Sequence, residues 1–106
     1  MKGKQDEFIQ YIEDQVSDLG IRAQRMFGGY GLYFEDTFFG IVHKGCLYLK
    51  TDASSREKYI AYGMQAFKPS QKQVLKNYYQ VPADILESKH ELKEWILESL
   101  GPRKAE

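Results

Sequence analysis

The apolar residues of this chain change their spacing after residue 20, and that change limits the folds open to it. Over residues 6–19 the apolar side chains recur every three or four positions, as on one face of an α-helix. These side chains are Phe8, Ile9, Ile12, Val16 and Leu19. From residue 30 the pattern becomes a strand-like alternation, in which Tyr30, Leu32 and Phe34 share one face. We therefore expect a helix that ends at Gly20, followed by β-structure, in an α+β fold.

Short strands are predicted through the middle of the chain. Two further β-rich runs, residues 38–42 and 46–50, follow the first strand closely. Residues 43–45, His-Lys-Gly, are typical of a tight turn, because glycine readily takes positive φ. These three runs predict an antiparallel meander. Residues 67–69 are expected to be extended before a proline, and residues 74–81 are ambiguous in period, although their tyrosines and valines favour a strand.

Two capping boxes predict two further helices. Ser54 with Glu57 predicts a helix that runs to about residue 62 and stops at Gly63. Ser88 with Glu91 predicts a final helix. The apolar face of that last helix consists of Leu92, Trp95, Ile96 and Leu100.

The predicted order is helix, three strands, helix, one or two strands, helix. Helices on one face of an antiparallel sheet let each layer bury its apolar side. We therefore expect a two-layer α/β sandwich with the helices packed mainly on one face. The 106 residues fit a single domain spanning residues 1–106, with a core of about 6–100.

Charge and cysteine content exclude several classes of protein. Fifteen Lys and Arg balance fifteen Asp and Glu, which excludes a uniformly basic nucleic-acid binder. The single cysteine, Cys46, cannot form an intrachain disulfide, as suits a reducing compartment. No run approaches the roughly 18 apolar residues of a membrane span. We expect a cytoplasmic protein that does not associate with membranes.

The neutral average hides a basic middle. Residues 37–80 hold seven bases and two acids, whereas residues 1–36 have a net charge of −3 and residues 81–106 of −2. Lysines could neutralise phosphates while neighbouring tyrosines stack on bases. The alternative, which we favour, is a solvated edge strand whose lysines block aggregation. The residues concerned are Lys50, Lys68, Lys72, Lys76, Tyr78 and Tyr79.

A glycine-rich stretch, Arg25-Met26-Phe27-Gly28-Gly29-Tyr30-Gly31-Leu32-Tyr33, is the most unusual part of the sequence. It could cradle a phosphate, with the arginine as an anion ligand. The glycine spacing matches neither a dinucleotide-binding fingerprint nor a P-loop, and no strand-to-helix transition follows. We therefore favour a packing role, in which the glycines allow close approach of a neighbouring group.

The sequence contains no set of residues that indicates a metal site or an enzyme. His43 and Cys46 lie three apart, but structural zinc needs four ligands and the only other strong nitrogen or sulfur ligand is His90. The same pair lacks an evident carboxylate that would orient the imidazole for catalysis. We expect no catalytic residue, no metal and no cofactor.

Three segments together resemble the TfoX N-terminal domain family. They are the glycine-rich stretch, residues 47–50 (Leu-Tyr-Leu-Lys) and residues 78–82 (Tyr-Tyr-Gln-Val-Pro). The resemblance covers roughly residues 6–100 and implies an α/β two-layer sandwich. Members include regulators of natural competence that control expression of DNA-uptake genes. Full-length members carry a second, C-terminal domain, so the resemblance implies a stand-alone N-terminal domain. The positions that carry it are Arg25, Met26, Phe27, Gly28, Gly29, Gly31, Tyr78, Tyr79 and Pro82.

The leading functional hypothesis is a non-enzymatic regulatory or adaptor domain that binds another protein, as a monomer or a homodimer. Eight Tyr and six Phe exceed what a small core needs, and surface tyrosines favour protein interfaces. The alternative is a nucleic-acid-binding module that uses the basic and aromatic middle of the chain. A third hypothesis is a small-molecule site with residues 25–31 at its rim.

Overall fold

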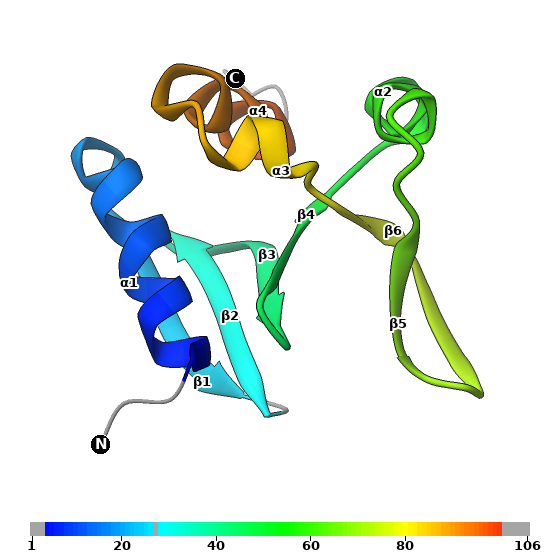
Figure 1. The fold of residues 1–106 in the computed structure, drawn as a ribbon, viewed down its shortest axis with the longest axis horizontal. Coiled ribbons are helices and arrows are strands. Elements are labelled where there is room, and N and C mark those ends of the chain that lie inside the picture. Colours follow the sequence, from blue (N-terminus) through cyan, green and yellow to red (C-terminus); the bar gives the residue numbers. More distant parts are fainter. Residues whose placement is uncertain (1–3, 27, 101–106) are drawn as a thin grey trace.

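The computed structural model describes residues 4–26 and 28–100, which form a six-stranded antiparallel sheet and four α-helices (Figure 1). The α-helices are α1 (Lys4–Gln15), α2 (Ala53–Ala61), α3 (Ala83–Leu86) and α4 (Lys89–Ser99). The strands are β1 (Ile21–Met26), β2 (Gly29–Phe34), β3 (Thr37–His43), β4 (Cys46–Lys50), β5 (Ala66–Ser70) and β6 (Gln73–Gln80). The α+β class predicted from the sequence is confirmed.

The first helix is shorter than its sequence pattern predicts. α1 ends at Gln15, and a separate 3₁₀ turn, Ser17–Leu19, continues the chain to Gly20. The predicted apolar stripe is confirmed, because Ile12 and Val16 are fully buried. The left-handed conformation expected at Gly20 is also confirmed, with φ of 69°, but Gly20 caps the 3₁₀ turn and not α1. The 3₁₀ turn is more tightly wound than the α-helix. It lets the apolar stripe stay against the core while the chain turns back towards the sheet.

The antiparallel meander has four strands, β1 to β4, one more than the three predicted from the sequence. β1 pairs with β2 from Ile21 opposite Phe34 to Met26 opposite Gly29, and the sheet order is β1-β2-β3-β4-β6-β5. The sequence does not predict β1, because Ile21 and the small Ala23 are the apolar residues on the side of this strand that faces the core. The predicted turn at residues 43–45 is confirmed, with positive φ at Lys44 and Gly45.

Three helical details differ from the predictions or refine them. The N-cap of α2 is Asp52 and not Ser54, because the Asp52 carboxylate accepts hydrogen bonds from the backbone N–H groups of residues 54 and 55. The N-cap Ser88 of α4 is confirmed, since its hydroxyl accepts from the N–H of Glu91 at 3.2 Å. The single-turn helix α3 was not predicted; it begins directly after Pro82, which rigidly ends the preceding strand.

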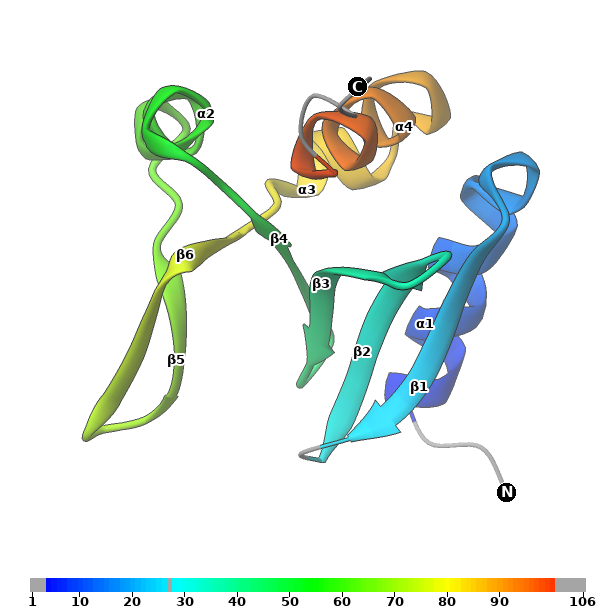
Figure 2. The same cartoon turned by 180° about the vertical axis from the view of Figure 1, so that it is seen from behind.

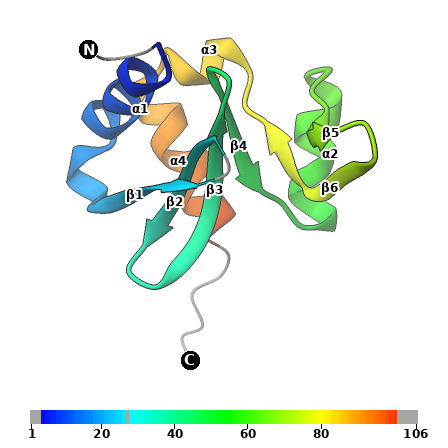
Figure 3. The same ribbon diagram turned by 90° about the horizontal axis from the view of Figure 1, so that it is seen from below.

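All four helices lie on one face of the sheet, as Figure 3 shows from below. Leu49 and Tyr79 are opposite one another in the β4–β6 ladder and both point towards the helices. Tyr59 of α2 packs between Tyr79 and Trp95 of α4, with ring centroids 6.1 Å and 4.8 Å away. One continuous core therefore joins the helices to a single side of the sheet.

The sheet is strongly curled, with its helix-free side concave (Figures 1 and 2). In a flat sheet the three strand spacings from β3 to β5 would put their side chains about 14 Å apart. The rings of His43 on β3 and Phe67 on β5 are instead 5.3 Å apart. A β-bulge contributes to this curvature, because Phe39 is an extra residue between the pairs Leu32–Gly40 and Tyr33–Phe38. The β5–β6 pairing also has two irregularities of register.

Candidate binding face

The helix-free face is the side of the sheet that turns away from the core. Register pairs identify its members: Gly31 lies opposite Ile41, Ile41 opposite Tyr48, and Lys50 opposite Tyr78. These pairs alternate with the pairs that enter the core, such as Val42 with Leu47. No described helix covers this face, so its side chains form a surface of the molecule.

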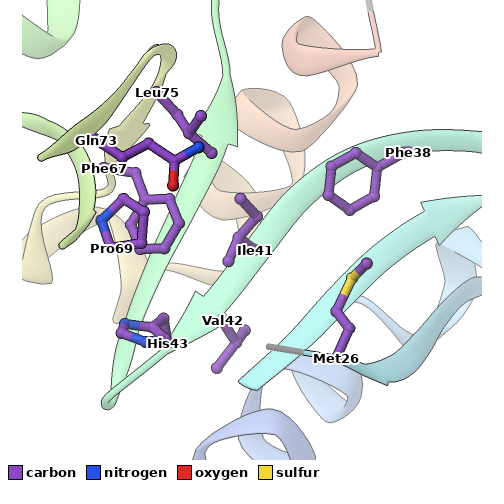
Figure 4. Close-up of a pocket in the computed structure, with 9 residues that line it drawn as sticks. All are labelled: Met26, Phe38, Ile41, Val42, His43, Phe67, Pro69, Gln73 and Leu75. Atoms are coloured by element: carbon purple, nitrogen blue, oxygen red, sulfur yellow. The ribbon is translucent and has the colours of Figure 1, made fainter. Parts of the chain in front are cut away.

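A pocket of about 220 Å³ occupies the concavity of the helix-free face (Figure 4). Ile41 of β3 lies at its centre, Met26 of β1 is on one side, and the β5–β6 hairpin, residues 66–80, forms the other side. Nearly all of the lining is apolar. The lining residues are Met26, Phe38, Ile41, Val42, His43, Phe67, Pro69, Gln73 and Leu75.

Two groups of packed rings fix the shape of this face. Phe67 contacts Tyr48 and His43, with ring centroids 4.6 Å and 5.3 Å away. Phe38 contacts Tyr33 and Tyr78, at 5.2 Å and 5.8 Å. The rings pack at tilted or edge-on angles, so each one holds its neighbours in place. The strands thus present a preformed aromatic surface.

Burial changes the acid–base properties of three side chains on the helix-free face. Desolvation, followed by the neighbouring Lys44, lowers the pKa of His43, so its imidazole is neutral at pH 7. Desolvation first, and then Cys46, raise the pKa of Tyr48 to about 12. Desolvation likewise raises the pKa of Tyr78. These groups can donate or accept hydrogen bonds on the helix-free face without carrying charge.

The glycine-rich stretch includes the end of β1 and the start of β2, and its glycines at positions 29 and 31 are closely packed. Gly28 takes φ of 75° and β2 begins at the next residue. A Cβ on Gly29 would lie 2.1 Å from the carbonyl oxygen of Val42, and a Cβ on Gly31 would lie 2.4 Å from the sulfur of Met26. The close approach expected from the sequence is therefore present. Phe27 lies outside the described residues.

The arginine of this stretch is not on the helix-free face. Arg25 is opposite Tyr30 in the β1–β2 ladder, and its guanidinium lies 5.3 Å from the centre of the Tyr30 ring. It also donates a hydrogen bond to the Tyr30 hydroxyl at 3.2 Å. Tyr30 in turn packs against the core. Arg22 is the β1 arginine that reaches the helix-free face, 4.7 Å from the Tyr33 ring centre.

The basic and aromatic residues considered as one possible binding site are divided by the fold. Tyr78 faces the helix-free side beside Lys50, whereas Tyr79 packs against the core. The three lysines of this region lie on β5, in the following turn and on β6. These lysines, Lys68, Lys72 and Lys76, are all exposed. Pro82 is the N-cap residue of α3 and is buried.

Charge is segregated between the strands and the helices. The six strands contain five Lys and Arg and no Asp or Glu. Helices α1, α3 and α4 together contain eight acids and three bases. Because these helices pack on the opposite side, their acids do not cover the helix-free face. The basic middle of the sequence therefore produces an acid-free sheet surface.

His43 and Cys46 are opposite one another in the β3–β4 ladder. The Cys46 sulfur accepts a long hydrogen bond from the Gln80 side chain at 3.5 Å, and the His43 ring packs on Phe67. Within residues 4–26 and 28–100, no group of three or more His, Cys, Asp or Glu side chains could hold a metal ion.

The pocket itself was not predicted from the sequence. Its main members, Ile41, Phe67 and Leu75, come from three strands whose spatial order depends on the curl of the sheet. One signal was available: β3 is apolar on both sides, with Phe39 and Val42 facing the core and Ile41 facing away. Two apolar faces on an antiparallel strand indicate that both sides are covered or bind something.

The structure is an α+β domain in which no described helix covers one face of the sheet. The family model of the TfoX N-terminal domain matches residues 14–101. The chain therefore belongs to the TfoX N-terminal domain family, as its sequence motifs implied. No curated protein sequence gives a significant match. Among the described residues, no helix has the length and apolar character needed to cross a lipid bilayer.

Proposed function

We propose that this chain is a non-enzymatic, cytoplasmic regulatory or adaptor domain that binds another protein through its helix-free face. We place the proposed role in the control of the expression of DNA-uptake genes, and membership of the TfoX N-terminal domain family supports this part of the proposal. The observation that supports binding is the concave, preformed aromatic face with a 220 Å³ apolar pocket at its centre. Such a surface loses water favourably only when something covers it.

The composition of the face is that of a protein interface. Centres of interfaces are enriched in aromatic residues, methionine and arginine and are depleted in acidic residues. The helix-free face presents Tyr33, Phe38, Met26 and Arg22, and the strands contain no acid. Tyr78 is half-buried there and adds a rigid amphipathic ring.

The same chemistry supports a binding role over a catalytic one. His43 and Cys46 are the groups on this face best suited to nucleophilic or acid–base chemistry. An activated thiol needs a base aimed at it and a group that orients the base. Here the ring of His43 packs on Phe67, and the six strands supply no carboxylate to orient it.

Affinity capture from native lysate of competent cells tests this proposal. The tagged chain should recover a specific partner reproducibly, and loss of the gene should reduce transcripts of DNA-uptake genes. A Tyr78→Ala variant should recover less partner, because Tyr78 is part of the face. Recovery of no specific protein, together with unchanged transcripts, contradicts the proposed function.

A second candidate function, nucleic-acid binding, is favoured by one observation. Residues 58–83 contain four lysines and no acid, and this run includes the whole β5–β6 hairpin. Lysines near exposed tyrosines can bind the phosphates of single strands. Binding of a labelled single-stranded oligonucleotide should then weaken steeply with salt. Absence of binding at low salt rules this candidate out.

A further inference from the structure

The pocket of the helix-free face has a size and a charged rim that specify its occupant. We propose that it receives one bulky apolar side chain, aromatic by preference, carried by a short acidic segment of a partner protein. The inference rests on the proposed function and adds the chemistry of the partner.

Volume restricts the occupant to a single side chain. Pockets for drug-sized ligands and cofactors are roughly 300–1,000 Å³, larger than the 220 Å³ found here. An apolar cavity of about 150 Å³ lined by Leu, Ile and Phe is large enough for benzene. One aromatic ring or large aliphatic group therefore fills the pocket, whereas a nucleotide or a cofactor does not fit in it.

The pocket wall matches an apolar anchor. Ile41 is 9% exposed and Phe67 is 5% exposed, so the centre of the pocket is formed by apolar side chains that are held tightly by their neighbours. The polar side chains in the lining are His43 and Gln73. Desolvation keeps the imidazole neutral, so it offers a hydrogen bond and no charge. A buried carboxylate or ammonium would find no countercharge in this wall.

The rim favours acidic residues on either side of the anchor. Four exposed lysines are each the direct chain neighbour of a lining residue: two lie in turns, where the chain passes the pocket edge, and two lie on β5 and β6, where successive side chains alternate between the faces of the sheet. They are Lys44 next to His43, Lys68 next to Phe67, Lys72 next to Gln73 and Lys76 next to Leu75. The six strands themselves contain no Asp or Glu. Charge complementarity therefore selects an acidic segment and steers its approach.

The same charges disfavour a second copy of the chain as the occupant. In a two-fold symmetric contact each helix-free face would meet its own equivalent. Lys50 and the hairpin lysines would then oppose like charges with no acid between them. Like charges placed directly opposite one another destabilise an interface.

Nucleic acid matches the lysines but not the rings. A base that stacks needs an aromatic side chain with an open flat face. Phe38 packs against Tyr33 at 52° and against Tyr78 at 47°, and all three are half-buried. Phe67 is almost fully buried. The rings therefore form a socket and not a stacking platform.

Selection from a phage-displayed library of random short peptides on the immobilised full chain tests the inference. The enriched peptides should carry an excess of Asp and Glu around one aromatic or large aliphatic residue. Affinity of a selected, fluorescently labelled peptide should fall at least about tenfold when alanine replaces that residue, because anchors of this kind dominate binding. High salt should weaken it further by screening the lysines.

Two matched pairs of variants locate the site. Leu75→Glu places a carboxylate in the pocket wall and should weaken binding of the selected peptide at least about tenfold. Leu97→Glu, at an exposed position of α4, should leave the affinity for this peptide unchanged. Lys72→Glu should weaken binding of the selected peptide about twofold to fivefold, whereas Lys89→Glu, on α4, should leave it unchanged. If Leu75→Glu fails to fold, Gln73→Glu serves instead, since Gln73 lines the pocket and is exposed.

Several results overturn the inference. In the selection, these results are enrichment of neutral or basic peptides, or no enrichment at all. In the binding measurements, they are equal affinity of the selected peptide for wild type and for folded Leu75→Glu, or binding at the pocket by an oligonucleotide and not by any peptide. A dimer in sedimentation that dissociates on Leu75→Glu identifies a second copy as the occupant and also overturns it. A partner captured from lysate that binds Leu75→Glu equally well refutes this inference and leaves the proposed function standing. Absence of both a captured partner and an enriched peptide refutes both.

Discussion

Gly29 has no room for a side chain, because the backbone of β3 lies directly against it. A Cβ at this position would be 2.1 Å from the carbonyl oxygen of Val42 and 3.3 Å from the Cα of His43. Real Cβ contacts essentially never fall below 3.0 Å, so Gly29→Ala must move the strands by at least 3.0 − 2.1 = 0.9 Å. The obstacle is a carbonyl within the β2–β3 ladder and cannot rotate away as a side chain would.

The cost of this substitution follows from the rigidity of the site. Extra atoms in a well-packed interior typically cost about 1–3 kcal/mol. A backbone obstacle gives little relief, so we expect a loss near the upper end, about 3 kcal/mol. For a domain of about 100 residues this lowers the melting temperature by roughly 10–20 °C. The small gain from a stiffer unfolded chain, about 0.4–1 kcal/mol, does not offset it.

Urea denaturation followed by tryptophan fluorescence measures the loss. Trp95 is the single tryptophan, is 6% exposed and packs on Tyr59, so its emission reports the core. Gly63→Ala is the control, because Gly63 has φ of 81° and nothing within 4 Å of a new Cβ. That control isolates left-handed backbone strain, which costs roughly 1–2 kcal/mol.

A second glycine separates backbone from side-chain obstruction. A Cβ on Gly31 would lie 2.4 Å from the sulfur of Met26 and 2.9 Å from a ring carbon of Phe38. Met26 is flexible, so Gly31→Ala should cost less than Gly29→Ala, and Met26→Ala should partly rescue it. The same truncation should not rescue Gly29→Ala. Equal stability of Gly29→Ala and Gly63→Ala would refute the steric explanation.

Three further predictions follow from burial and ionisation. Hydrogen bonds from Ser55 and Ser54 lower the pKa of the Asp52 carboxyl in the folded state. The stability that this carboxylate contributes is therefore present above the pKa of the unfolded state and is lost as the pH falls through the folded pKa. Denaturation of wild type and Asp52→Asn should show a stability difference that shrinks in acid. Desolvation lowers the pKa of His43, so the folded state should lose stability as pH falls from about 6.5 through the folded value, and thermal melts of His43→Gln should show less of this loss. Ile96→Ala removes a fully buried side chain and should cost about 2–5 kcal/mol in urea titration, unlike a truncation on the exposed face of the same helix.

The sequence predicted those parts of the fold that depend on neighbours along the chain. The stripe of α1, the turn at residues 43–45 and the limits of β4 all follow from local spacing and turn chemistry. The N-cap of α2 was misplaced because Asp52, Ser54 and Ser55 are all good capping residues. The backbone conformation before α2 determines which of these side chains accepts hydrogen bonds from the free N–H groups of the first turn.

The candidate site could be predicted only in part. Its basic character was visible in the segment charges, and its aromatic character in the tyrosine and phenylalanine count. The pocket was not visible, because Phe67 meets His43 only through the bulged, curled sheet. Tyr78 and Tyr79 are neighbours in a strand and therefore point to opposite faces of the sheet. Which of the two faces meets the helices depends on the whole fold.

The β5–β6 hairpin reaches its place in the sheet by a long detour of the chain. Two residues join β3 to β4, whereas 22 residues (51–72), including α2, separate β4 from β6. Closing the longer loop costs about 2 kcal/mol more entropy than closing the short one. The two sides of the pocket therefore belong to segments that form at different cost.

Local opening of the hairpin is the consequence of this connection. We expect residues 66–80 to exchange their amide hydrogens faster than residues 29–49, because the hairpin can detach while the meander and its helices stay folded. Each such event would open the pocket without unfolding the core. An occupant that touches both Ile41 and Phe67 ties the two segments together, so slower exchange in the hairpin alone would be a direct signal that the pocket is filled.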